Sequence, residues 1–469
     1  MITAPPRAPS AAAILPDAAR SGVPAMPLAE ILGALSHALD LTEGQPAGHC
    51  MRSCWIGMHV GREMGLDAAA LHDLYYAVLL KDLGCSSNAA RLCQLYLADD
   101  LGFKRDFKRV GDRLPEVLRF VVTHTGLRAG LAERFRAIAN IVRNGGEIAR
   151  ELIETRCQRG AEIALRLRFA EEVADGIRAL DEHWSGNGKP RGLAGAAIPV
   201  QARIALLAQV VDVFHTGSGR DAALHEARRR AGSWFDPQAV EALHRLEGDR
   251  GFWEMLRSPE LEAAVLRLEP ARRAEAVDDG YLDDVAAAFA TVIDAKSPYT
   301  RGHSERVAVF TDLIAEAMDL EDAPRRRLRR AALLHDIGKL GVSNQILDKP
   351  GRLDEAEWAA MRGHALHSER ILSRIGAFGE LARIGGAHHE RLDGKGYPRG
   401  LEGDEICPAT RIVTTADVFD ALTAERPYRA AMPLPEALSI MEKDVGSAFD
   451  PDCFEALRRA LGRAGMMPA

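Results

Sequence analysis

Apolar residues recur every three or four positions along most of the chain, as they do on one face of an α-helix. Segments 282–295, 304–317 and 326–334 show this spacing, which predicts amphipathic helices, whereas a half-buried strand would alternate apolar and polar residues. Glycine and proline gather at 348–351 and 394–398, where loops are expected. The pattern predicts an all-α fold.

The chain also resembles itself at a long spacing, which indicates a domain duplication. The matched segments keep their order and are 48–52 with 302–306, 79–84 with 333–338, 190–193 with 398–401, and 235–237 with 449–451. The offset is 254 residues for the first two pairs, 208 for 190–193 and 214 for the last. The first copy therefore carries about 46 extra residues between 84 and 190, and we expect two tandem helical domains of one type.

Composition suggests where these domains begin and end. Residues 1–27 are rich in alanine and proline, and we expect them to be a disordered tail. The first copy is predicted to span 28–250 and the second 281–469. Segment 251–280 contains many charged residues and little periodicity, so it is predicted to be a linker.

Charge and cysteine content restrict the classes of partner and compartment. The 469 residues include 67 acidic and 60 basic ones, for a net charge of -7, which argues against broad binding to DNA or anionic membranes. Seven cysteines without CxxC spacing fit a reducing compartment. No apolar run approaches the roughly 18 residues of a membrane span, and no leader pattern is present. We expect a cytoplasmic protein; a homodimer and a complex with another signalling protein both stay open.

The second copy contains a candidate catalytic pair at a helix end. His335-Asp336 follows the apolar segment 331–334 and precedes Lys339. Two ligands and a cation where a helix meets a loop can approach a metal and a phosphate together. Taken alone, the pair also fits an ordinary helix end with an exposed aspartate.

Further histidines and carboxylates in the same copy favour a metal site. They are His303, His364, His388, His389 and Asp417. Imidazole and carboxylate ligands suit Fe, Mn, Co, Ni or Zn, and the set is large enough for two divalent transition-metal ions, which can activate a water and neutralise a phosphoryl oxygen. Asp417 lies in a largely apolar helical segment, where an unpaired carboxylate is costly, and a ligand role removes that cost.

These segments resemble the HD-GYP phosphodiesterases over residues 294–457. The similar segments are 299–307, 335–339, 364, 388–398, 416–423 and 426–429. The resemblance implies an HD-GYP domain whose metal ligands are His303, His335, Asp336, His364, His388, His389 and Asp417. It implies a catalytic role for Lys339 and Asp336, with Lys339 touching the scissile phosphate. It also implies substrate contacts by Tyr397, Asp420, Arg426 and Arg429.

The resemblance implies hydrolysis of the bacterial messenger cyclic di-GMP to linear pGpG, to GMP, or to both. Tyr299 stands where some members have a glutamate that binds a third metal, so two metals and a linear product are favoured. Two other functions stay open. The first is a phosphohydrolase for another nucleotide or a phosphomonoester, because the His-Asp core does not set the substrate. The second is a non-catalytic nucleotide-sensing scaffold, against which the complete ligand set counts.

The first copy has lost much of this site. Lys81, Cys85 and Gln209 stand where the second copy has His335, Lys339 and Asp417. The histidine pair is predicted to align with Glu182-His183 in a loop two residues shorter, and the counterpart of His364 falls near Arg156 or Cys157. Because a lysine among metal ligands repels cations, the first copy is expected to be non-catalytic. A packing partner and a sensing pocket are the two roles considered.

Overall fold

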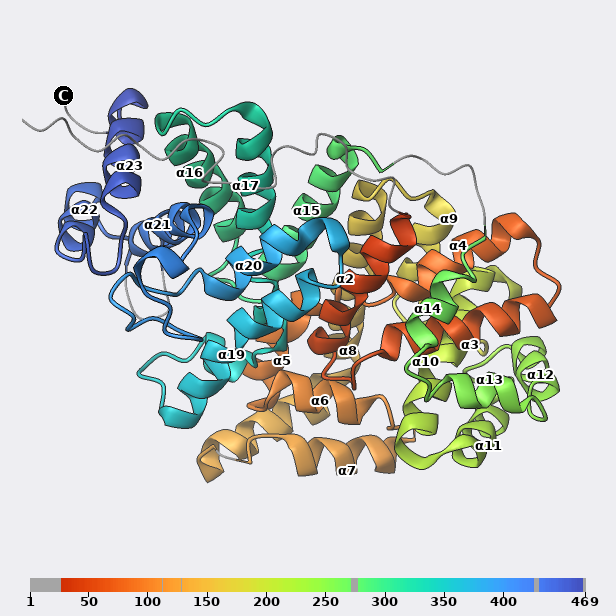
Figure 1. The fold of residues 1–469 in the computed structure, drawn as a ribbon. Helices are drawn as coiled ribbons and strands as arrows, with labels where there is room; N and C mark the ends of the chain where they lie inside the picture. The colour runs from red at the N-terminus through yellow and green to blue at the C-terminus, as the bar shows by residue number, and fades with distance from the viewer. Residues whose placement is uncertain (1–26, 112, 128, 271–276, 426–429, 467–469) are drawn as a thin grey trace, which may run out of the picture. The chain divides into compact units, whose positions relative to one another are not determined.

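The computed structural model describes residues 27–111, 113–127, 129–270, 277–425 and 430–466. In these ranges the chain forms helices and isolated bridges but no β-strand, which confirms the all-α prediction (Figure 1). None of the described helices is long and apolar enough to cross a membrane. The predicted tail, 1–27, lies outside the described residues except for Pro27.

The chain divides into two compact units. The C-terminal unit comprises Asp278–Val342 and Ile346–Ala469, and the N-terminal unit comprises Met26–Val277 with Ser343–Gln345. Each unit contains its own buried apolar core.

The C-terminal unit is a bundle in which α16 packs against α17, α21 and α23, while α19 packs against α20 and the short 3₁₀ turn η3. Its larger helices run from green to blue in Figure 1. They are α15 Asp279–Asp294, α16 His303–Ala317, α17 Asp322–Leu334, α19 Glu355–Leu372, α20 Gly379–Ala387, α21 Pro408–Thr423, α22 Leu434–Glu442 and α23 Pro451–Arg463, with α18 Asn344–Leu347, η3 Ile337–Gly341, η4 Gly376–Phe378 and η5 Gly403–Glu405 between them.

Helix ends in this unit coincide with the predicted ligands. Gly302 has a φ of +68°, a left-handed conformation that glycine adopts without steric cost, and His303 follows as the first residue of α16. His335 and His388 are the residues directly after α17 and α20. Local helix termination therefore places these imidazoles where chain segments meet.

The N-terminal unit repeats this order of helices. Its elements are α2 Leu28–Thr42, α3 His49–Glu63, α4 Ala68–Leu79, η1 Cys85–Asn88, α5 Ala89–Tyr96, α6 Asp100–Phe107, α7 Leu114–His124, α8 Leu131–Arg166, α9 Glu171–Arg178, η2 Gly195–Ala197, α10 Val200–Ser218, α11 Arg220–Arg230, α12 Pro237–Arg245, α13 Arg250–Met255 and α14 Leu261–Leu266. Helices α3, α9 and α10 begin at the positions equivalent to α16, α20 and α21, at the offsets found in the sequence. Two tandem helical units of one type are confirmed.

The glycine-rich loops of the two units are equivalent residue by residue. Each has a cis peptide bond before proline, at Lys189-Pro190 and Tyr397-Pro398, and bridges at Ser185–Ala194 and Asp393–Glu402. Glu182 accepts hydrogen bonds from the backbone N–H groups of residues 191 and 193, as Glu390 does from those of residues 399 and 401. Every pair keeps the offset of 208 residues, so the loops have equal length.

The predicted alignment of His388-His389 with Glu182-His183 is therefore wrong. Because Glu182 performs the structural task of Glu390, the histidine pair corresponds to Leu180 and Asp181. The sequence comparison matched one histidine to another, whereas the loop hydrogen bonds determine the register.

A close contact between segments locates the counterpart of His364. A Cβ added to Gly338 would lie 2.0 Å from the carbonyl oxygen of His364, and one added to Gly84 would lie 1.9 Å from that of Arg156. Arg156 is therefore equivalent to His364. The extra residues of the N-terminal unit lie between Cys85 and Arg156 and form α5, α6, α7 and the first part of α8.

The structure differs from the predicted linker at 251–280. Residues 250–255 and 261–266 form α13 and α14, and Phe252, Trp253 and Val265 are buried in the N-terminal unit. The many charged residues of this segment suggested a linker, but several of its apolar residues are buried and pack against the core. Residues 271–276 lie outside the described part of the chain.

Candidate metal centre

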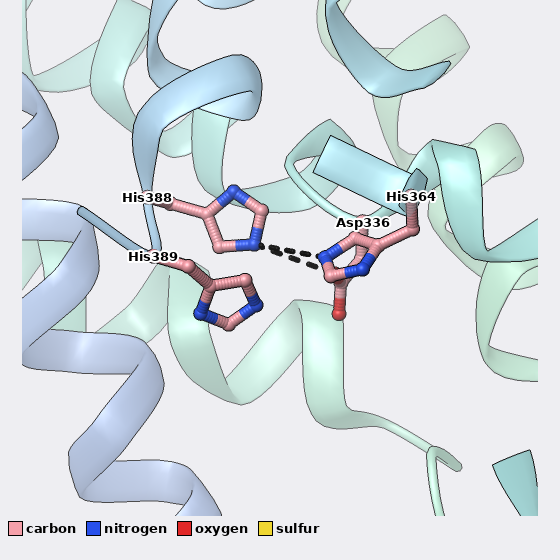
Figure 2. A group of neighbouring side chains, drawn as sticks. All are labelled: Asp336, His364, His388 and His389. Carbon is pink, nitrogen blue, oxygen red and sulfur yellow. Dashed lines mark hydrogen bonds and ion pairs between the residues drawn. The ribbon is translucent and has the colours of Figure 1, made fainter. Parts of the chain in front are cut away.

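All seven predicted ligands come together in the C-terminal unit, in two groups. His303, His335 and Asp417 form the first group, and Asp336, His364, His388 and His389 form the second. Within each group the candidate ligand atoms all lie within 4.8 Å of one another. Figure 2 shows the side chains of the second group converging from separate segments of the chain.

Asp336 connects the two groups. Its Oδ2 atom lies 3.5 Å from Nε2 of His303 and 3.2 Å from Nε2 of His335. Its Oδ1 atom lies 3.4 Å from Nε2 of His364 and 3.6 Å from Nε2 of His388. A carboxylate with one oxygen toward each set of imidazoles could be shared by two divalent ions, if two are bound.

A polar partner at Nδ1 orients each of four imidazoles. Nδ1 of His335, His364 and His388 lies 2.6, 2.6 and 2.9 Å from the carbonyl oxygen three residues earlier in the chain. Nδ1 of His303 instead faces a carboxylate oxygen of Asp420 at 2.7 Å. When Nδ1 donates a hydrogen bond, Nε2 is free to bind a metal. A hydrogen bond from the other ring nitrogen is the usual support of a metal-binding histidine.

Several polar atoms at the centre need a partner that the described protein atoms do not supply. Nε2 of His303, Nε2 of His335 and Oδ1 of Asp336 are buried without a hydrogen-bond partner among these residues. Buried polar atoms rarely stay unsatisfied, because the cost is large. Imidazole nitrogens and carboxylates together are ligands for divalent transition metals, so the residues present fit such ions.

The charged groups at the centre also favour the binding of a cation. Burial alone would lower the pKa of His303, but the carboxylates of Asp336, Asp417 and Asp420 raise it to about 10, which shows how strongly the first group attracts positive charge. Burial lowers the pKa of His364 to about 3, so this imidazole is neutral, the form that binds metals.

Lys339 lies beside the centre and has the position expected of a phosphate-binding cation. Its Nζ atom is 2.5 Å from Oδ2 of Asp336, and 17% of the side chain is exposed. Tyr397 lies next to the second group, with its ring centroid 4.7 Å from that of His389 and the guanidinium of Arg362 5.5 Å from its ring. A substrate contact by Tyr397 stays a prediction.

Asp420, a predicted substrate contact, lies next to His303. The residue is 1% exposed, and its oxygens accept hydrogen bonds from Nε of Arg306 at 2.6 Å and face Nδ1 of His303 at 2.7 Å. These contacts suit a residue that orients His303, and a substrate contact by Asp420 stays a prediction. Arg426 and Arg429, the other predicted substrate contacts, lie outside the described residues.

Sequence reasoning missed the residues that hold the ligands in place. Arg306 anchors Asp420, Ser368 accepts a hydrogen bond from the N–H of Gly338 at 2.9 Å, and Thr414 donates to the carbonyl of His388 at 2.7 Å. A signal for Arg306 and Asp420 was present, since the first copy retains both as Arg52 and Asp212 although it lost most ligands.

The fold and site define a metal-dependent phosphohydrolase of the HD type, and known proteins agree. The family model of the HD domain matches residues 129–239 and 287–453. The 3′3′-cGAMP-specific phosphodiesterase 3 of Vibrio cholerae is 56% identical over 435 residues, which are 93% of this chain and 95% of that protein. The chain belongs to the HD-GYP family of phosphodiesterases.

Two further similarities refine this placement. The crystal structure of a cyclic GMP-AMP specific phosphodiesterase of V. cholerae is 50% identical, with a TM-score of 0.65 and coverage of 94% of this chain and 98% of that one. The cyclic di-GMP phosphodiesterase response regulator RpfG of Xanthomonas campestris is 39% identical over 180 residues, which are 38% of this chain and 47% of that protein.

Proposed function

We propose that the C-terminal unit hydrolyses one phosphodiester bond of a cyclic dinucleotide, with 3′3′-cGAMP as the preferred substrate. The observation that carries the reaction class is the pair of ligand groups joined by Asp336. The choice of cGAMP rests on the relative that is similar over 93% of this chain. Cyclic di-GMP, which the sequence motifs favoured, is the second candidate, because RpfG matches only 38% of the chain.

His303, His335 and Asp417 would hold one divalent ion and His364, His388 and His389 the other, with Asp336 shared. Two such ions supply positive charge that neutralises phosphoryl oxygens and lowers the pKa of water. Lys339 provides a further cation beside this centre that is not itself among the ligands. Its ammonium would bind a non-bridging oxygen of the scissile phosphate and stabilise the charge that grows there in the transition state.

The proposed reaction is a hydrolysis that consumes one water molecule. The oxygen of water bonds to phosphorus, the bond from phosphorus to the 3′-oxygen breaks, and the leaving oxygen takes up a proton. The product is one linear dinucleotide with a 5′-phosphate and a free 3′-hydroxyl. Tyr299 in place of the glutamate of three-metal relatives favours a stop at this stage.

The test uses the purified full chain, freed of metal and reloaded separately with Mn²⁺, Fe²⁺, Co²⁺, Ni²⁺ or Zn²⁺. Each form is incubated with 3′3′-cGAMP, cyclic di-GMP, cyclic di-AMP and p-nitrophenyl phosphate, and the products are separated over time. We expect a linear dinucleotide first, and a kcat/KM for cGAMP at least about tenfold above that for cyclic di-GMP, roughly 1.4 kcal/mol of discrimination.

Other outcomes assign the other functions. Equal or faster turnover of cyclic di-GMP would refute the choice of cGAMP while keeping the reaction class. Turnover of the monoester alone would refute the class. Tight binding of a cyclic dinucleotide without turnover in every metal form would indicate the sensing scaffold.

A further inference from the structure

The counterpart of the metal centre in the N-terminal unit keeps the aspartate and arginine that support the first histidine, but few of the ligands. Nδ1 of His49 lies 2.6 Å from Oδ2 of Asp212, and Arg52 donates from Nε to Oδ1 of Asp212 at 2.6 Å, as in the C-terminal unit. The residues equivalent to the seven ligands are His49, Lys81, Asp82, Arg156, Leu180, Asp181 and Gln209. Two of them, His49 and Asp82, retain the ligand type.

Two of the replacements bring positive charge to these positions. Lys81, fully buried, stands in place of His335, and its ammonium donates to Asp82, the counterpart of Asp336. Arg156 stands in place of His364, and its guanidinium donates to Asp181. Each of the two former ligand groups therefore contains a protein cation paired with a carboxylate.

The extra residues of this unit add two more cations. Nζ of Lys108, directly after α6, lies 2.8 Å from Oε2 of Glu43 and 3.9 Å from Oδ1 of Asp82. Nζ of Lys104, on α6, donates to the carbonyl oxygens of Thr42 and Cys85 at 3.0 and 2.8 Å. The C-terminal unit has no equivalent of α6, because this helix belongs to the inserted residues.

Nearby cations lower the pKa values of the Glu43 and Asp82 carboxyls. Burial alone would raise the pKa of Glu43, but the ammonium of Lys108 lowers it to about 2. Opposite charges in a dry site attract strongly, and a buried carboxylate deprived of its cation is costly. The carboxylates of the centre are therefore paired with cations of the protein, while Nε2 of His49 is buried without a hydrogen-bond partner among the described residues.

Glu43, Asp82 and Cys85 lie close enough together to hold a metal ion, but their surroundings oppose it. Ammonium groups already contact both carboxylates. Burial raises the pKa of the Cys85 thiol well above its usual value, and a protonated thiol is a poor ligand.

We infer that Lys81, Lys108 and Arg156 take the place of the two metal ions in the N-terminal unit, and that the inserted helix α6 closes this centre. The unit then folds around a permanent, metal-free set of ion pairs. It needs neither metal nor substrate to keep its structure, which distinguishes it from a sensing pocket. This inference does not depend on the substrate proposed for the other unit.

Tryptophan fluorescence can observe the N-terminal unit separately in the full chain. The described tryptophans at 55, 184, 234 and 253 lie in that unit and Trp358 in the other. In a Trp358→Phe background we expect the fluorescence melting temperature to stay within about 1 °C when metal is removed with a chelator, since ligand removal shifts only the unit that binds it. A clear fall in that temperature would overturn the inference.

In the same background, Lys108→Met should lower the fluorescence melting temperature by roughly 5 °C or more, because it leaves buried Glu43 without its closest cation. Arg105→Met is the matched control, since Arg105 is on α6 but 53% exposed and paired with Asp106; its effect should stay within about 1 °C. Equal shifts in the two variants would refute a role for Lys108 in the centre.

Metal uptake tests the replacement directly. Lys81→His with Arg156→His and Lys108→Met should raise the Mn²⁺ content by about one ion per chain, since it restores imidazoles and removes the competing ammonium. The same histidine changes with Lys108 retained should add none. Uptake with Lys108 present would show that α6 does not close the centre, and a folded triple variant without extra metal would refute replacement by these cations.

Discussion

Nδ1 of His303 lies 2.7 Å from Oδ2 of Asp420, and the equivalent atoms of His49 and Asp212 lie 2.6 Å apart. The N-terminal unit has kept this pair, together with the arginine that anchors it, although most ligands are gone. The retention of this pair in both units favours a role for the aspartate in supporting the histidine. We therefore propose that Asp420 positions a metal ligand, and a substrate contact by Asp420 stays a prediction.

Asp420→Asn should weaken metal affinity about 10- to 100-fold, the usual effect of altering a residue that orients a metal-binding histidine. At saturating metal the KM should change little. Metal titration followed by steady-state kinetics checks this, with Asp212→Asn as the matched control that leaves both quantities unchanged. A raised KM with normal metal affinity would instead support the substrate contact predicted from the sequence.

Asp336→Asn should reduce occupancy at both ions together, because one carboxylate faces both groups, and turnover should fall to the level of metal-free protein. Asp82→Asn should leave turnover unchanged but destabilise the N-terminal unit by about 3–5 kcal/mol, since it leaves the buried ammonium of Lys81 unpaired. Elemental analysis, kinetics and denaturant unfolding separate these effects. Loss of a single ion in Asp336→Asn would argue against a bridging carboxylate.

Lys339→Met should retain full metal occupancy. It should lower kcat by roughly 10²- to 10³-fold, the usual effect of removing one donor that stabilises the transition state. Lys395→Met, at an exposed lysine of the glycine-rich loop, is the control and should keep normal turnover. The two are compared at matched metal content. Near-normal kcat in Lys339→Met would show that this assignment is wrong.

Gly338→Ala should lower both stability and metal occupancy. The added Cβ would lie 2.0 Å from the backbone of His364 and 2.7 Å from that of Ser368, so α19 must shift and carry His364 with it. Gly363→Ala is the control on the same helix, since the nearest atom to its Cβ is 4.0 Å away and alanine favours helix. Unchanged metal content in a folded Gly338→Ala variant would contradict the close approach.

The helical fold, the duplication and the seven side chains that come together in the C-terminal unit could be predicted, because each leaves a local trace in the chain. Helical spacing places His303, His335 and His388 near helix ends, and the motifs supply their chemical types. The support of His335 and His388 by carbonyls three residues earlier is also local. The role of Asp420 was not local, because its partner is more than a hundred residues away.

The class of fold and the presence of two copies could be predicted from the chain alone, since residue types and their order are enough for each. The register of Leu180-Asp181, the burial of Phe252 and Trp253, and the approach of Lys108 to Glu43 and Asp82 could be seen only in the three-dimensional structure. These depend on hydrogen bonds and charges between segments distant in the chain. The spacing of residues along a sequence does not show which distant side chains are in contact. Those contacts depend on how the core packs.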